Sequence, residues 1–392
     1  MIGRREFVKS GLAAAGALSL GPAFWESAFA APARAGKGPY GALLAPDRNG
    51  LMLPRGFRSR IVARGGALVA GTGYLFHISP DGAATYGTRD GGWVLVSNSE
   101  VPGVGGASAI RFASDGKIET AYRILEGTNL NCAGGATPWG TWLSCEETDD
   151  GQVWECDPFG SSRARLRPAL GTFKHEAVAY DPREDRLYLT EDRKDGALYR
   201  FTLDRRGDLD RGRLEIAMEP DARGRTNWKR VPDPSASEVP TRFQVPGRRV
   251  FERGEGIWYD SGNVYVATTA DRRIHVYATQ TRRLGTLFKA SRVSDSELTS
   301  VDNLTVSRAG DIFVCEDHGD PDPLDVALIT QEPKREVSRF LRATGEQHKR
   351  PVASELTGIC FNPAGDRLYV SSQRGNLLGI IYEISGPFRR RS

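Results

Sequence analysis

One strand pattern recurs six times along the chain, and it constrains the fold more than any other feature of the sequence. Each copy opens with Gly or Asp, continues through apolar and β-branched residues, has a small sixth residue and then becomes polar. The copies occupy residues 92–99, 140–147, 185–192, 262–269, 310–317 and 366–373, with start-to-start spacings of 48, 45, 77, 48 and 56 residues. A period of about 45 to 50 residues with several strands per unit is typical of a β-propeller.

Further short apolar segments surround each copy and complete a repeating sheet. Turn residues such as Asn362-Pro363-Ala364-Gly365 lead from a preceding strand into the copy, and another apolar segment follows it. Three or four strands in each of six units predict an all-β fold, a six-bladed β-propeller, as one domain over residues 51–388. A pair of β-sandwiches also uses many strands, but it does not explain six matching copies. We expect residues 318–335 to form a loop over one face.

The first 30 residues indicate an export signal rather than part of the fold. Arg4 and Arg5 begin an Arg-Arg-x-Phe-x-Lys run, residues 10–20 are weakly apolar and too short to span a bilayer, and residues 28–30 fit a small-x-small cleavage site. A Sec signal or a retained anchor is the alternative. We predict export through the twin-arginine (Tat) translocase into the periplasm or the medium. No stable membrane insertion is expected after signal removal, and residues 31–50 are predicted to be a linker.

Charge and cysteine content narrow the function classes. The 53 basic and 49 acidic residues nearly balance, which gives no global case for nucleic-acid binding. Five cysteines leave at least one thiol unpaired or bound to something else. Because no CxxC pair occurs, the sequence contains neither a zinc knuckle nor a thioredoxin-type motif.

Acidic residues stand at equivalent positions around the repeated strands. In an antiparallel hairpin the start of the first strand lies beside the end of the second, so these residues from every blade meet at one mouth of the ring. The residues that this rule gathers are Cys132, Glu146, Glu147, Glu176, Glu255, Asp302, Glu316 and Asp317, together with Glu100, Glu191 and Asp192.

So many like charges repel one another unless protons or cations intervene. Carboxylates suit Ca²⁺, Mg²⁺, Mn²⁺ or ferric iron, and the Cys132 thiolate favours iron or another transition metal. The sequence therefore predicts metal binding at the mouth. The alternative is that these residues are solvated turn acids.

Two further side chains are candidates for chemistry beside the acids. His175 directly precedes Glu176 and is a candidate metal ligand or general acid, or a structural hydrogen-bonding histidine. Arg253 stands two residues before Glu255, so both point to the same side of an extended strand. An arginine there can grip a phosphate with two donors, or it can simply compensate the acids.

At these residues the sequence resembles a known family. The run NCAGGATPWGTWLSCEE over residues 131–147 is similar to the signature of PhoX-type alkaline phosphatases, and residues 173–176 and 355–358 fit the same family. The similarity extends from about Leu51 to Arg374. It implies a propeller phosphatase that holds iron and calcium in its mouth and is exported by the twin-arginine route.

The resemblance also implies roles for individual residues. Cys132 would be the thiolate ligand to iron, Glu176 and Glu255 would be carboxylate ligands, and Arg253 would hold the substrate phosphate. The remaining acids would also serve the metals; they are Glu146, Glu147, Asp302, Glu316 and Asp317. Two positions depart from the family pattern, because Gly254 replaces an expected Pro and Ser99 an expected His.

We therefore predict an exported, monomeric, metal-dependent phosphatase that hydrolyses small-molecule phosphomonoesters, with Arg253 and His175 as catalytic residues. Two alternatives remain open at this point. A Ca²⁺-dependent lactonase also uses a six-bladed ring, but it needs one Ca²⁺ and no thiolate. A non-catalytic propeller would use the same mouth for binding alone.

Overall fold

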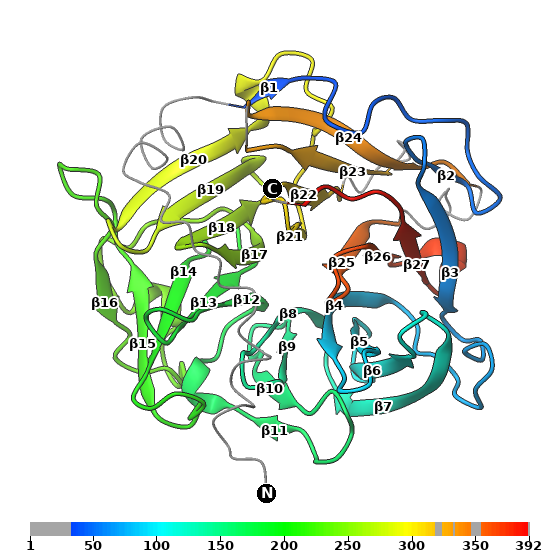
Figure 1. Cartoon of the computed structure of the whole chain (residues 1–392). Coiled ribbons are helices and arrows are strands. Elements are labelled where there is room, and N and C mark those ends of the chain that lie inside the picture. Colours follow the sequence, from blue (N-terminus) through cyan, green and yellow to red (C-terminus); the bar gives the residue numbers. More distant parts are fainter. Residues whose placement is uncertain (1–32, 318–323, 332–333, 346–353, 391–392) are drawn as a thin grey trace, which may run out of the picture. The chain divides into compact units, whose positions relative to one another are not determined.

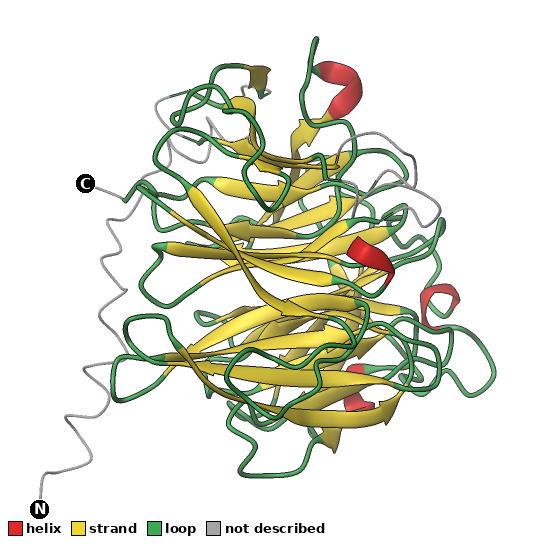
Figure 2. Cartoon of the chain, turned by 90° about the vertical axis from the view of Figure 1, so that its right-hand side faces the viewer, coloured by secondary structure: helices red, strands yellow, loops and turns green. Residues whose placement is uncertain are grey.

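The computed structural model describes residues 33–317, 324–331, 334–345 and 354–390. Within these residues six β-sheets stand as blades around a central axis (Figure 1). Strands make up nearly all the regular structure of this part of the chain, and the helical segments are short 3-10 turns (Figure 2). The prediction of an all-β, six-bladed β-propeller is confirmed. No helix among the described residues is long and apolar enough to cross a membrane.

The first four blades are meanders in which consecutive strands pair, and the first strand of each lies at the axis. Blade one comprises β4 (Pro80–Gly87), β5 (Trp93–Ser99), β6 (Gly105–Phe112) and β7 (Ile118–Thr128). Blade two comprises β8 (Asn131–Ala136), β9 (Trp142–Glu146), β10 (Val153–Cys156) and β11 (Arg165–Leu166). Blade three comprises β12 (His175–Asp181), β13 (Arg186–Glu191), β14 (Leu198–Leu203), β15 (Gly212–Ala217) and β16 (Trp228–Arg230). Blade four comprises β17 (Gly254–Asp260), β18 (Asn263–Thr268), β19 (Arg273–Ala278) and β20 (Arg283–Lys289).

The last two blades recruit strands from the beginning of the described chain. Blade five contains β21 (Leu304–Val306), β22 (Ile312–Cys315), β23 (Leu324–Ile329) and β24 (Glu336–Ala343), and its edge pairs with β1 (Arg34–Ala35) and β2 (Leu51–Met52). Blade six contains β25 (Leu356–Phe361), β26 (Arg367–Ser372) and β27 (Ile380–Ser385), and its outer strand is β3 (Arg58–Arg64). The ring is therefore closed by pairing two ends of the sequence, as Figure 1 shows for β3 and β27.

Two sequence-based boundaries differ from the structure. Leu324–Ile329, within the segment predicted as a loop, is the third strand of blade five, so that prediction was wrong for these residues. Residues Arg34–Ala35, within the predicted linker, pair in parallel with β24. The predicted export signal lies outside the described residues.

The repeated strand is the second strand of every blade. It is covered on both faces by neighbouring blades, which explains its nearly continuous apolar character. Its fourth position carries a large buried residue in several blades, such as Tyr188, Tyr265 and Tyr369, each at most 1% exposed. The rings pack between adjacent blades: Tyr188 lies 5.8 Å from Tyr277 of blade four, and Tyr369 lies 5.7 Å from Phe112 of blade one, centroid to centroid.

Candidate metal centre

In five blades a potential metal ligand lies at the same point of the inner strand, and in each of them the strand has a β-bulge there. In blade two, Asn131 pairs with Glu146 and Gly134 with Ser144, so Cys132 and Ala133 together oppose one residue, Cys145. Two residues opposite one form a β-bulge, which bends the strand and re-aims a side chain.

The other four blades repeat this bulge. The register shifts in the same way around Asp81, Glu176 and Glu255. In blade five the amide of Asp302 donates to the carbonyl of Cys315 at 3.0 Å, and the amide of Cys315 donates to Asn303 at 2.8 Å, which is the equivalent arrangement. In blades two to five the residue opposite the bulge is the small sixth position of the repeat, whereas in blade one it is Asn98 at the seventh.

The ligand atoms of the five bulge residues, with those of Glu100 and Glu147, form three overlapping groups. Within each group the atoms lie within 4.8 Å of one another. The groups are Asp81, Glu100 and Cys132; Cys132, Glu147 and Glu176; and Glu176, Glu255 and Asp302. Because Cys132 and Glu176 each belong to two groups, the three form one continuous arc across blades one to five.

The electrostatics of this arc call for bound cations. Burial, followed by repulsion from neighbouring acids, raises the pKa of Glu176, Glu255 and Asp302 well above the usual range. The same causes raise the pKa of Glu100 to about 10. Oε2 of Glu176 is buried and has no hydrogen-bond partner among the described residues. The donor set fits both metals that the sequence resemblance implies, since carboxylates suit calcium and a thiolate beside carboxylates suits iron.

Three basic side chains flank the acids. Lys174 Nζ lies 2.7 Å from both Glu147 and Asp192, and Arg253 contacts Asp192 through Nε at 2.8 Å and Glu255 through Nη2 at 3.0 Å. Arg374 lies across the mouth on blade six. Its Nη1 is 3.3 Å from an oxygen of Glu355. Arg253 also has a positive φ of 56°, an unusual backbone conformation of the kind that clusters at functional sites.

The alkaline phosphatase PhoX family model matches residues 99–155 and 149–375 of the chain. The chain belongs to this family. It is therefore a metal-dependent phosphatase, and the three ligand groups are its possible metal-binding positions. This finding favours the phosphatase prediction over the lactonase and the non-catalytic propeller.

Solved structures support the same fold. The PhoX protein of Pseudomonas fluorescens, solved in complex with vanadate, a transition state analogue, has a TM-score of 0.73 and 17% identity; the match covers 90% of this chain and 98% of that one. A protein of unknown function from Bacteroides thetaiotaomicron has a TM-score of 0.51 and 10% identity, over 84% of this chain and 76% of that one. No curated protein sequence matches the chain.

Of the residues that the sequence placed at the mouth, six lie in the ligand groups of this PhoX family member: Glu100, Cys132, Glu147, Glu176, Glu255 and Asp302. Asp317 lies close enough to raise the pKa of Asp302, although it belongs to none of these groups among the described residues.

Two predicted ligands instead support turns. Glu146 accepts hydrogen bonds from the amides of Asn129 at 2.9 Å and Gln152 at 3.2 Å. Glu316 accepts hydrogen bonds from the amides of Thr299 at 2.6 Å and Ser300 at 3.2 Å. In each acidic pair the first residue therefore satisfies backbone donors of its own blade, and these positions do not support the metal-ligand assignment of Glu146 and Glu316.

His175 also points away from the ligand groups. Its Nε2 donates to the carbonyl of Gly171 at 3.0 Å, and its ring lies 3.6 Å from the ring of Phe173, centroid to centroid. Burial lowers the pKa of His175 to about 4, so the ring is neutral near pH 7. The assignment of His175 as a catalytic residue is not supported by this position, which is that of a structural histidine.

Sequence analysis missed four charged residues of the mouth: Asp81, Lys174, Glu355 and Arg374. Asp81 stands eleven residues before the copy that starts at Gly92, whereas Cys132 precedes its copy at Gly140 by eight. The turns after β4 and β8 both have five residues, but β4 extends six residues beyond its ligand and β8 only four, which hid the equivalence. The motif that contains Lys174 was recognised, but only the following His-Glu pair received a role.

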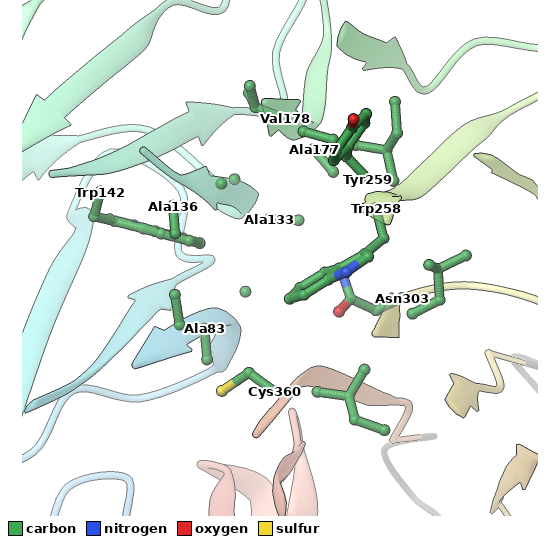
Figure 3. A pocket seen from close by; sticks show the side chains of 18 of the residues that line it. Ala83, Ala133, Ala136, Trp142, Ala177, Val178, Trp258, Tyr259, Asn303 and Cys360 are labelled. Atoms are coloured by element: carbon green, nitrogen blue, oxygen red, sulfur yellow. The ribbon is translucent and has the colours of Figure 1, made fainter. Parts of the chain in front are cut away.

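A cavity of about 230 Å³ lies behind the ligand arc, along the inner strands. Residues directly after the ligands line it, including Ala133 and Ala177, and Trp258, Asn303 and Cys360 also border it (Figure 3). The acids thus lie at one end of a central channel whose lining combines small residues such as Ala133 with aromatic ones such as Trp142 and Trp258.

Proposed function

We propose that the chain is an exported phosphomonoesterase whose mouth holds iron and calcium. The observation that carries this proposal is the arc of three overlapping ligand groups with one thiol among its carboxylates. We infer that the two groups containing Cys132 hold iron, because a thiolate favours a transition metal. The group of Glu176, Glu255 and Asp302 offers only oxygen and suits calcium.

Bound metal ions would neutralise the charge of the phosphate and activate an oxygen nucleophile. The chain's own contribution is to hold and orient the phosphate. Arg253 is 35% exposed at its side chain, and a planar guanidinium matches two phosphate oxygens at once. Asp192 and Glu255 fix this guanidinium on one side, so its orientation is set before substrate arrives.

Vanadate binding by the Pseudomonas fluorescens PhoX protein supports a similar binding mode here. We expect vanadate to inhibit hydrolysis of p-nitrophenyl phosphate competitively. We also expect a chelator to abolish this hydrolysis, and readdition of iron and calcium to restore it. Elemental analysis of protein exported by its native route should find both metals. Absence of both metals from active protein would contradict the proposal.

The thiol provides a sharper test. Cys132→Ser should lose iron and most activity, whereas Cys156→Ala, a buried cysteine of β10, should retain both. Unchanged metal content and activity in Cys132→Ser would instead favour a Ca²⁺ enzyme of the lactonase type.

Export is proposed from the twin arginines alone. Replacing Arg4 and Arg5 by Lys should retain the precursor in the cytoplasm, where fractionation and immunoblotting would detect it. Normal export of this variant would favour a Sec signal. Size-exclusion chromatography tests the expected monomer.

A further inference from the structure

Four exposed leucines lie on the mouth face, over blades six and one. Leu68, Leu75, Leu377 and Leu378 are 64%, 60%, 61% and 42% exposed, and together we call them the apolar rim. They belong to the segment before β4 and to the turn after β26, both of which lie at the same end of the blades as the ligand arc. Large apolar side chains gathered on a surface mark a binding site more often than scattered ones do.

The two segments of the rim are held together by the backbone. Leu68 and Leu75 face each other in an isolated antiparallel bridge. The amide of Ser79 donates to the carbonyl of Leu378 at 2.8 Å, and the amide of Gly65 donates to Gly379 at 2.9 Å. The rim is therefore one ordered surface, not a set of independent loops.

The rim continues directly from the ligand arc. Gln373 Nε2 donates to Asp81 Oδ2 at 2.5 Å and also to Glu100, which ties the end of β26 to two potential ligands. The next residue is Arg374. The amide of Leu377 donates to the backbone carbonyl of Arg374 at 2.8 Å, so Leu377 belongs to the same tight turn as this mouth residue.

The backbone holds Leu377 in an unusual conformation. Asn376 and Leu377 have φ values of 54° and 71°, in the left-handed region that bulky residues rarely adopt. Burial does not explain the leucine, because its side chain is 61% exposed. Strain that persists at an exposed apolar residue beside a candidate active site points to a role in binding.

We propose that the apolar rim receives the organic group of the substrate. The preferred substrates are then phosphomonoesters with an alkyl or aryl group adjoining the ester oxygen. A phosphate held at the ligand arc projects its ester group out of the mouth, and on the blade six side that group meets Arg374 and then the leucines. This inference rests on the proposed phosphatase function and names its substrate class.

A homologous series of substrates tests the inference. Metal-loaded protein is assayed for phosphate release from methyl, ethyl, butyl and hexyl phosphate. Because each buried methylene favours binding, kcat/KM should rise about twofold to fourfold per added carbon until the rim is covered. Leu377→Asn removes the apolar surface but keeps a residue that tolerates positive φ, and it should flatten this rise. Leu166→Ser, an exposed leucine on the outer strand β11, is the matched control and should keep the full rise.

Binding provides a readout that does not depend on turnover. Calorimetry should find n-hexylphosphonate binding at least tenfold more tightly than methylphosphonate, and Leu377→Asn should reduce this ratio. Turnover of all four esters with equal kcat/KM, or equal affinity for the two phosphonates, would overturn the rim proposal and leave the phosphatase function intact. Turnover of none by metal-loaded protein would overturn the proposed function itself, and the rim proposal with it.

Discussion

The Nε of Arg253 donates to Oδ1 of Asp192 at 2.8 Å, so the acid that follows the second strand of blade three orients the arginine that begins blade four. The other oxygen of Asp192 accepts a hydrogen bond from Lys174 at 2.7 Å. Burial opposes the charge of Asp192, but the hydrogen bonds from these cations hold its pKa below the usual range. Asp192 is thus an ionised anchor for the proposed phosphate-binding residue, and it belongs to no ligand group among the described residues.

Asp192→Asn keeps the shape of this anchor and removes its charge. Arg253 then loses its charge-assisted partner and its fixed orientation. We expect kcat/KM for p-nitrophenyl phosphate to fall about 10- to 100-fold, the scale on which misplaced binding groups act, with unchanged metal content. Steady-state kinetics and elemental analysis measure both quantities.

Asp195→Asn is the matched control, since Asp195 lies on the same turn but pairs with Arg242 at 3.2 Å. This variant should behave like the wild type. If Asp192→Asn lost metal along with activity, Asp192 would have to be counted as a ligand instead of a positioning residue.

The acidic pairs show what sequence reasoning captured and what it missed. The repeat correctly predicted that residues 146–147 and 316–317 stand at the mouth end of their strands. It did not separate the two members of each pair, because their roles depend on turn amides such as Asn129 and Gln152 that hydrogen-bond only in the folded blade. Backbone amides of the same blade hydrogen-bond the first acid of a pair, as at Glu146, whereas the second acid, such as Glu147, is free to face the metal centre.

Two adjacent substitutions test this division. Glu147→Gln should lower bound metal and reduce kcat about 100-fold, because it removes a potential ligand. Glu146→Gln should leave metal content unchanged and lower the free energy of unfolding by about 1 to 3 kcal/mol, because it weakens two charge-assisted hydrogen bonds. Elemental analysis and urea unfolding distinguish the two. Loss of metal from Glu146→Gln would place that residue back among the ligands.

The strand topology was likewise predicted only in part. The six copies correctly located the second strand of each blade, because a strand buried on both faces has a clear apolar pattern. The sequence did not predict that β3 closes the ring on β27, because pairing over more than 300 residues leaves no local pattern. Asp81 was not predicted because β4 extends further beyond its ligand than the inner strands of blades two to five do, so Asp81 lies at a different offset from the repeat.

In blades one to four the inner-strand ligand is followed by Gly or Ala, and whether packing requires this small residue can be tested in blade four. A Cβ on Gly256 would lie 2.8 Å from Cα of Asn303 and from the carbonyl oxygen of Asp302. Gly256→Ala should therefore push blades four and five apart, lower the free energy of unfolding by about 1 to 3 kcal/mol and weaken metal binding at Asp302. Thermal unfolding and metal titration measure these effects.

Gly73→Ala is the control for this substitution, because a Cβ at Gly73 meets nothing within 4 Å. It should leave stability and metal binding unchanged. Wild-type stability in Gly256→Ala would show that the inner strands are less closely packed than the bulges require.

Removing the metals should make stability depend on pH in a direction set by the buried acids. Burial and neighbouring carboxylates raise the pKa of Glu100 from 4.5 to about 10, and burial, followed by Asp317, raises that of Glu355 to about 8. A folded-state pKa above the unfolded value means that the stability contribution is complete below pH 4.5 and is lost as pH rises towards the folded-state pKa. Between pH 5 and 8, metal-free protein should therefore lose up to about 1.4 kcal/mol per pH unit for each such group.

Urea unfolding of chelated protein at pH 5 and pH 8 measures this loss. Glu100→Gln stays neutral throughout and should reduce the slope, whereas Glu119→Gln, which removes an exposed acid paired with Arg111, should not. Added iron and calcium should remove most of the pH dependence, because bound cations offset the repulsion that protons otherwise relieve. A metal-free protein that grows more stable from pH 5 to pH 8 would mean that the arc carries less uncompensated charge than its buried carboxylates imply.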